Sequence, residues 1–113
     1  DKEKELEMLK DLEAAERAYY GERRKEAVRQ FEAVNAKAVE TNHEPFQEQI
    51  ALRLALLHYE LHDLYSSLEW HHKHLEVTIK SNRWTQQIQA FDNIAYIYLL
   101  QNQQHSAQLF MEK

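Results

Sequence analysis

The chain has 113 residues, a formal net charge of −5, one glycine, one proline and no cysteine. So few turn residues argue against a β-sandwich or barrel, and the lack of cysteine excludes disulfides and thiolate sites. The negative charge argues against nucleic acid as a partner, since phosphate binding needs a basic face. No apolar run approaches the ~20 residues that span a bilayer, so we expect no membrane insertion.

Breaks in the sequence divide it into segments of helical character. Clear loop signals occur at 40–45 (ETNHEP) and 80–84 (KSNRW), and weaker breaks lie near 21–24, 61–65 and 101–105. Between them, apolar residues recur every three to four positions, the spacing of amphipathic helices. The chain is therefore predicted to be all-α. The first segment is expected to bury Leu6, Leu9, Ala14, Ala15 and Ala18, and the second Ala27, Phe31, Val34 and Ala38.

The two clear loops are 40 residues apart, and the match at this offset extends beyond them. Thr41-Asn42 corresponds to Ser81-Asn82, and Gln47 corresponds to Gln87. Small residues recur at two places in each period, and we interpret them as places where paired helices approach closely. These residues are Ala15, Ala55 and Ala95, and Ala27, Ser67 and Ala107.

An internal repeat of this length predicts one domain, 1–113, built from three helix–turn–helix units. The units span about 3–40, 45–80 and 84–113, and the last is truncated. Because both ends of the chain read as helix, we expect a fragment of a longer protein. The truncated helix leaves an apolar edge, Leu109 and Phe110, which predicts pairing with a second copy as a homodimer.

Three segments carry small and large residues in the same order: LEAAERAYYGERRKEAVRQFEAV, RLALLHYELHDLYSSLEWHHKHL and DNIAYIYLLQNQQHSAQLFMEK. This order resembles the tetratricopeptide repeat family, in an extended form whose period of 40 exceeds the usual ~34. The family's Trp and Gly landmarks are largely absent, and HEAT-type repeats, with periods of about 40–47 residues, are the alternative. The matching residues are Ala15, Ala27 and Phe31, then Leu54, Ala55 and Ser67, then Ile94, Ala95, Tyr98 and Ala107.

The resemblance implies both a fold and a function. The fold is a set of antiparallel helix–turn–helix repeats stacked as a short right-handed α-solenoid. The function is that of a protein- or peptide-binding scaffold with a concave groove lined by the first helix of each repeat. Such arrays form the interaction or sensory part of larger proteins, bacterial signalling proteins among them, and we expect a cytoplasmic location. By register, the groove residues are Glu16, Tyr19, Tyr20, Gln49, Arg53, Leu56, Tyr59, Gln89, Asn93 and Tyr96.

The tyrosines and Arg53 are the most informative of these residues. Tyr and Arg are over-represented in binding hot spots, because they combine buried area with a polar group. Tyr19, Tyr59 and Tyr96 are equally consistent with packing between repeats. We expect Arg53 and Asn93 to be able to hold a carboxylate.

The run EWHHKHLEV (69–77) concentrates histidines. In the register of the family His58, His71 and His74 face inward, whereas His72 faces the surface. We favour packed, hydrogen-bonded core histidines, since there is no cysteine and no H-E-x-x-H motif. The alternative is a metal- or pH-responsive sensory domain, in which the three inward histidines bind zinc or nickel or become charged at low pH. No cofactor is expected.

Catalysis has little support in the sequence. One glycine is too few for a phosphate-binding loop, and no nucleophile elbow is present. Ser66 and Ser67 lie near His71, but nothing supplies an orienting acid or an oxyanion hole. The chain is therefore predicted to be a binding module and not an enzyme.

Overall fold

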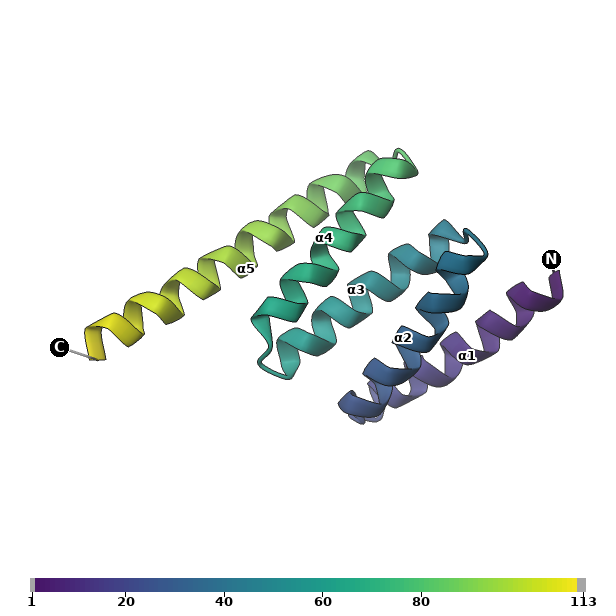
Figure 1. Ribbon diagram of the computed structural model, residues 1–113, viewed down its shortest axis with the longest axis horizontal. Helices are drawn as coiled ribbons and strands as arrows, with labels where there is room; N and C mark the ends of the chain where they lie inside the picture. The colour runs from purple at the N-terminus through teal and green to yellow at the C-terminus, as the bar shows by residue number, and fades with distance from the viewer. Residues whose placement is uncertain (1, 112–113) are drawn as a thin grey trace.

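The protein consists of α-helices joined by short turns, so the all-α prediction is confirmed. The computed structural model describes the backbone of residues 2–111 and the side chains of residues 2–105. Successive helices run antiparallel and each packs on the next, in a bundle of 60 × 32 × 19 Å (Figure 1). Within this part of the chain, no helix combines the length and apolarity needed to cross a membrane. The helices are α1 (Lys2–Tyr20), α2 (Arg24–Glu40), α3 (Glu44–Glu60), α4 (Leu64–Lys80) and α5 (Trp84–Met111).

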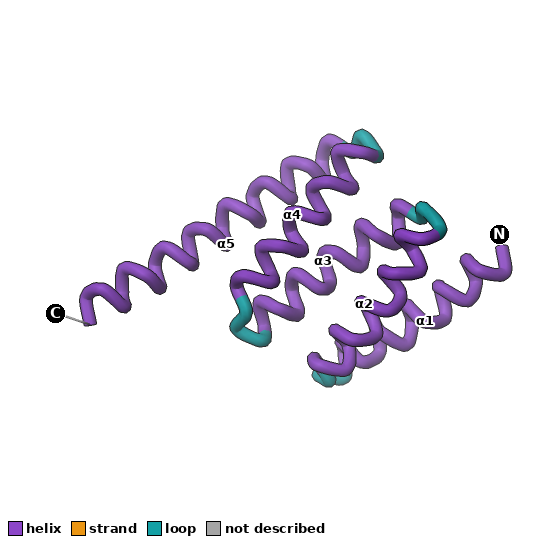
Figure 2. The backbone as a smooth tube through the Cα atoms, in the orientation of Figure 1, coloured by secondary structure: helices purple, strands orange, loops and turns teal. Residues whose placement is uncertain are grey.

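The four turns share one geometry (Figure 2). The middle residue of each turn donates its N–H to the carbonyl three residues earlier, and the next residue donates to the carbonyl five residues earlier. In the second turn, Asn42 N–H lies 3.1 Å from Val39 O, and His43 N–H lies 2.8 Å from Ala38 O. This is the Schellman ending, which needs a left-handed residue in the middle. The middle residues, with φ between 58° and 64°, are Glu22, Asn42, His62 and Asn82.

The predicted breaks near 21–24, 40–45, 61–65 and 80–84 are therefore confirmed as turns. The break predicted near 101–105 is wrong, because α5 continues through it to Met111. Each of the other turns is held by a helix that packs back on the preceding one. In the described part of the chain nothing packs back on α5, and the glutamines of this stretch favour helix. The side chains of Ala107, Leu109 and Phe110 lie outside the described residues.

The helix faces agree with prediction on α2 and differ on α1. All the residues predicted to be buried on α2 are buried. On α1, Leu6 and Leu9 are 57% and 41% exposed, and Met8 and Leu12 are buried in their place. The buried stripe of α1 is set by the neighbours that cover it, chiefly α2, and the two exposed leucines lie beside that stripe.

Paired helices meet at small residues, as the sequence predicts. Ala15 and Ala27 are fully buried where α1 packs on α2. Ala55 and Ser67 are fully buried where α3 packs on α4, and Ser67 Oγ donates a hydrogen bond of 2.8 Å to the Ala55 carbonyl oxygen. Only a small side chain at both places lets a hydroxyl reach the neighbouring backbone. Ala95, the third residue of this series, is exposed.

Residues 40 apart also make the same hydrogen bonds between helices. Gln47 Nε2 donates to the Ala38 carbonyl oxygen, and Gln87 Nε2 donates to the Thr78 carbonyl oxygen, both at 3.1 Å. Each bond satisfies a carbonyl in the last turn of a helix, where no partner exists within that helix. The start of α3 and the start of α5 are thereby tied to the helix before them.

The turns predict how stability responds to the residue at their centre. Glutamate is disfavoured at positive φ, whereas asparagine tolerates it. Glu22 and Asn82 occupy the same place in their turns, and both are exposed. We expect Glu22→Asn to raise the free energy of unfolding by about 1 kcal/mol and Asn82→Glu to lower it by a similar amount. Urea unfolding measures both, and unchanged midpoints in the two variants would contradict this account.

Candidate functional site

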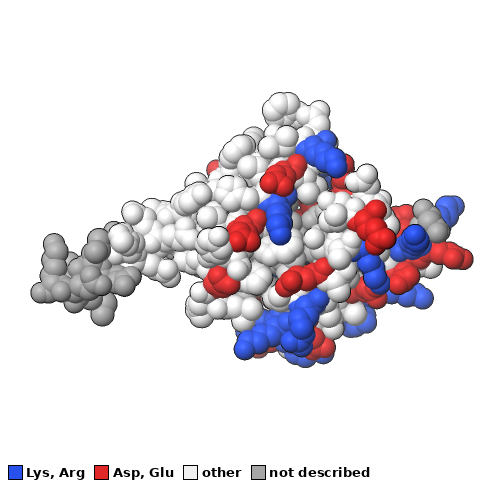
Figure 3. Space-filling model, viewed as in Figure 1, with Lys and Arg blue, Asp and Glu red and all other residues white. Residues whose placement is uncertain are grey.

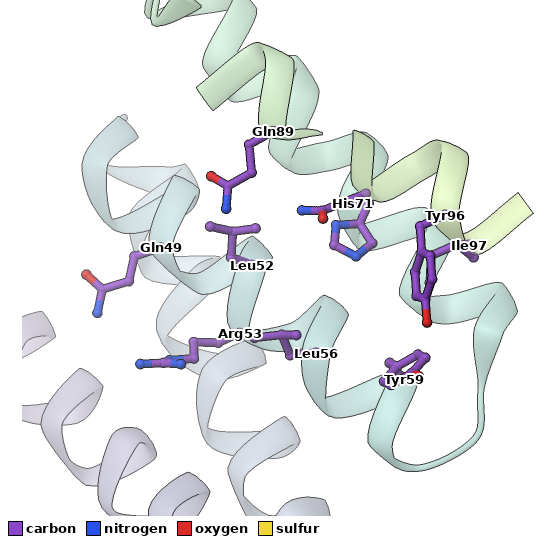
Figure 4. A pocket seen from close by; sticks show the side chains of 10 residues that line it. Gln49, Leu52, Arg53, Leu56, Tyr59, His71, Gln89, Tyr96 and Ile97 are labelled. Atoms are coloured by element: carbon purple, nitrogen blue, oxygen red, sulfur yellow. The ribbon is translucent and has the colours of Figure 1, made fainter. Parts of the chain in front are cut away.

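A cavity of about 520 Å³ opens between α3 and α5, with α4 behind it (Figure 4). Its volume lies within the range of small-ligand and peptide-anchor sites. All the α3 and α5 residues predicted for the groove line this cavity. The lining residues are Gln49, Leu52, Arg53, Leu56 and Tyr59 from α3, His71 from α4, and Gln89, Asn93, Tyr96 and Ile97 from α5.

The cavity combines apolar and amide side chains. Leu52, Leu56 and Ile97 supply its aliphatic surface. Gln89 and Asn93 make no side-chain hydrogen bond to any residue that the structure describes. Their amides therefore remain free to donate to and accept from a bound molecule.

Tyr59 and Tyr96 lie next to each other at one end of the cavity (Figure 4). Hydrogen bonding with Tyr96 is the main reason that the pKa of Tyr59 is raised above its ordinary value. Both rings are partly open to solvent, with 38% and 52% of their residues exposed. The two phenols thus stay protonated at neutral pH and offer hydroxyl groups beside an apolar surface.

Arg53 connects the cavity to α1. Its Nε donates to Glu16 Oε1 at 2.9 Å, and its Nη2 donates to the Tyr20 hydroxyl at 3.0 Å. Its guanidinium also lies 4.7 Å from the centre of the Tyr19 ring. The three residues predicted on α1 therefore surround Arg53 and do not line the cavity. The carboxylate that Arg53 holds belongs to Glu16, and not to a ligand as the sequence suggested.

Three lining residues were not predicted for the groove. Leu52 lies one helical turn before Leu56, and Ile97 lies one turn after Asn93, so helical spacing carries a signal for both. His71 comes from a second helix of a pair, which the resemblance places in the core. Its place in the lining depends on how far apart α3 and α5 lie, which local sequence does not determine.

The inward histidines are buried as predicted, but without the expected hydrogen bonds. His71 is 5% exposed and His74 is fully buried, whereas His72 is exposed. Nδ1 of His71 and both ring nitrogens of His74 have no hydrogen-bond partner among the described residues. The closest carboxylate oxygen, Glu48 Oε1, lies 4.0 Å from His74 Nε2.

Burial controls how these rings titrate. It is the main cause that lowers the pKa of His71 to about 4, and the neighbouring His74 and His72 add to the effect. Burial also lowers the pKa of His74. Both imidazoles are therefore neutral near pH 7, which suits their apolar surroundings.

His58 lies apart from the other two histidines of the proposed metal set. Its Nδ1 is 3.9 Å from Asp63 Oδ2, at the turn between α3 and α4. Among the residues that the structure describes, no group of three or more His, Cys, Asp or Glu side chains is placed to hold a metal ion. The alternative of a site formed by His58, His71 and His74 therefore gains no support from the geometry.

Comparisons with models of protein families, with curated proteins and with solved structures each gave no match to this chain. The structure itself establishes five sequential antiparallel helices that pack neighbour to neighbour. The tetratricopeptide assignment therefore rests on the order of residues in the sequence.

The lowered pKa of His71 predicts a loss of stability in acid. The ring has an ordinary pKa of 6.5 in the unfolded chain and a pKa of about 4 when folded. Its contribution is therefore complete above pH 6.5 and is lost as the pH falls from 6.5 through 4. We expect this group alone to remove about 3 kcal/mol of unfolding free energy over that interval.

A pair of variants isolates this effect by urea unfolding at several pH values. His71→Phe, which introduces the residue found 40 positions earlier at Phe31, should reduce the acid-dependent loss by that amount. His72→Gln, on the exposed side of α4, should retain the wild-type loss. An unchanged pH profile in His71→Phe would show that this histidine does not carry the dependence.

Proposed function

We propose that the chain is an interaction module of the tetratricopeptide type that holds an uncharged, apolar segment of a partner peptide between α3 and α5. The observation that carries the proposal is the composition of the cavity. Leu52, Leu56 and Ile97 form an aliphatic surface beside the open amides of Gln89 and Asn93. Apolar cavities with a few placed polar groups are typical of binding sites.

The charges around the cavity favour a neutral ligand. Arg53 is the one Asp, Glu, Lys or Arg among the described residues that line it. Its guanidinium is already paired with Glu16, at 2.9 Å. An acidic peptide would have to displace Glu16, and a basic peptide would meet Arg53. We therefore propose an aliphatic or aromatic side chain as the anchor, which gains from burial alone.

The amides around the cavity suit the backbone of such a peptide. Gln49, Gln89 and Asn93 each carry both donors and an acceptor, the groups that pair with peptide carbonyls and N–H groups. The hydroxyls of Tyr59 and Tyr96 add donors at one end. The proposed mode is one apolar anchor in the cavity, with the flanking peptide backbone held by amides.

The hydrogen bonds that recur every 40 residues support the repeat interpretation that underlies this function. Gln47 and Gln87 make equivalent bonds, and small residues mark both helix pairs. In stacked helical repeats the first helices of neighbouring units line a common groove, which is the place of this cavity. We propose binding without turnover, with any catalytic output supplied by other parts of a larger protein.

Proton sensing is a second candidate, favoured by the position of His71. This ring lines the cavity and its Nδ1 has no partner among the described residues. A bound apolar side chain would remove the ring further from water, so the ligand would favour the neutral imidazole. Ligand binding should then weaken as the pH falls toward 4.

Selection from a library of random peptides displayed on phage tests the first proposal. We expect the selected peptides to share a large aliphatic or aromatic residue and to lack a common charge. Leu56→Glu places a carboxylate in the aliphatic surface and should weaken binding of a selected peptide by more than about tenfold, because the charge would have to be buried or the anchor expelled.

The matched control is Ile79→Glu, which makes the same change at an exposed aliphatic residue of α4. This variant should bind the selected peptide as the wild-type chain does. The proposal fails if Leu56→Glu binds equally well, or if the selected peptides share an acidic or basic motif instead of an apolar residue.

A further inference from the structure

One stripe of α5 is apolar and uncovered. Ile88, Phe91 and Tyr98 are 63%, 56% and 53% exposed, and Ala95 between them is also exposed. The four residues follow each other at spacings of three and four, so they lie along one side of the helix. The helix packs on α4 through a different side, where Ile94 and other residues are buried.

The corresponding stripe of α3 is buried under its partner helix. Forty residues earlier, Glu48, Ala51 and Ala55 are 8%, 2% and 0% exposed. The helix that covers them is α4, whose Ser67 hydroxyl bonds to the Ala55 carbonyl oxygen. The stripe is therefore the surface through which such a helix accepts an antiparallel partner, and on α5 that partner is missing from the described structure.

The chain itself carries a segment of the kind that covers such a stripe. Asn102 stands at the place of Asn42 and Asn82, and Ala107 stands at the place of Ala27 and Ser67. The backbone nevertheless runs straight through this point as α5, which projects beyond the other helices (Figure 1). A straight α5 holds this segment away from the stripe of its own chain and leaves it free to reach the stripe of a second copy.

We propose that two copies of the chain associate through antiparallel α5 helices, so that residues 104–111 of each copy cover the exposed stripe of the other. Shifting the Ala55–Ser67 contact by 40 residues pairs Ala95 with Ala107 of the second copy. This register places the two-fold axis near residues 101–102. Because both copies use the same surface, the contact closes as a dimer. It does not depend on the peptide cavity.

The charge of α5 favours this occupant. From Trp84 to His105, Asp92 is the one residue of the Asp, Glu, Lys and Arg types. Figure 3 shows charged side chains over the other helices, whereas the projecting part of α5 is white up to the grey atoms. Two copies of this helix can therefore approach with little repulsion, and the exposed stripe supplies apolar area to bury.

Sedimentation velocity over a range of concentrations measures the association directly. We expect a concentration-dependent species with twice the mass of one chain. Phe91→Glu should raise its dissociation constant by more than about tenfold, while Tyr65→Glu, a matched change at a residue of α4 that is 69% exposed, should leave it unchanged. Tyr98→Glu serves in place of Phe91→Glu if circular dichroism shows that the latter loses helix.

Since the chain has no cysteine, single cysteines test the register. Asn102→Cys lies on the stripe near the two-fold axis and should form an intermolecular disulfide under mild oxidation, because the two Cα atoms would lie within about 7 Å. Gln104→Cys, on the far side of the helix, should form little. A chain that stays monomeric at all concentrations, or cross-linking at residue 104 in preference to 102, would overturn the proposal.

Discussion

Close contact between paired helices at small residues is the constraint on which this structure depends. At the α3–α4 pair the contact is close enough for the Ser67 hydroxyl to bond to the Ala55 carbonyl, with both residues fully buried. A larger side chain at either place would push the helices apart and leave that hydroxyl buried without a partner, at a cost of about 1–3 kcal/mol. The same arrangement of buried alanines holds α1 on α2.

The two candidate surfaces of the protein follow from this pairing. Because α4 occupies one side of α3, another side of α3 faces α5, and the cavity with its leucines, amides and tyrosines lies between them (Figure 4). Because α5 has no following helix in the described structure, its own pairing stripe is left open at Phe91 and Ala95. One surface thus suits a peptide, and the other suits a helix.

The sequence predicts those features that depend on local chemistry and spacing. The turns at Asn42 and Asn82, the buried small residues and the inward histidines follow from residue type and an offset of 40. The features it misses depend on neighbours in space. The buried face of α1 is set by the helices that pack on it, the pairing of Arg53 with Glu16 joins residues 37 apart, and α5 stays straight where a turn needs a returning helix.

Amide hydrogen exchange at low and at high protein concentration tests the central claim, that a helix of this chain is stable when its small-residue stripe is covered. The account predicts slow exchange in α2, α3 and α4 at both concentrations, since their partners belong to the same chain. In α5, exchange between Ile88 and Tyr98 should slow markedly at the higher concentration, where a second copy covers the stripe. Equal exchange in α5 at both concentrations would contradict the account.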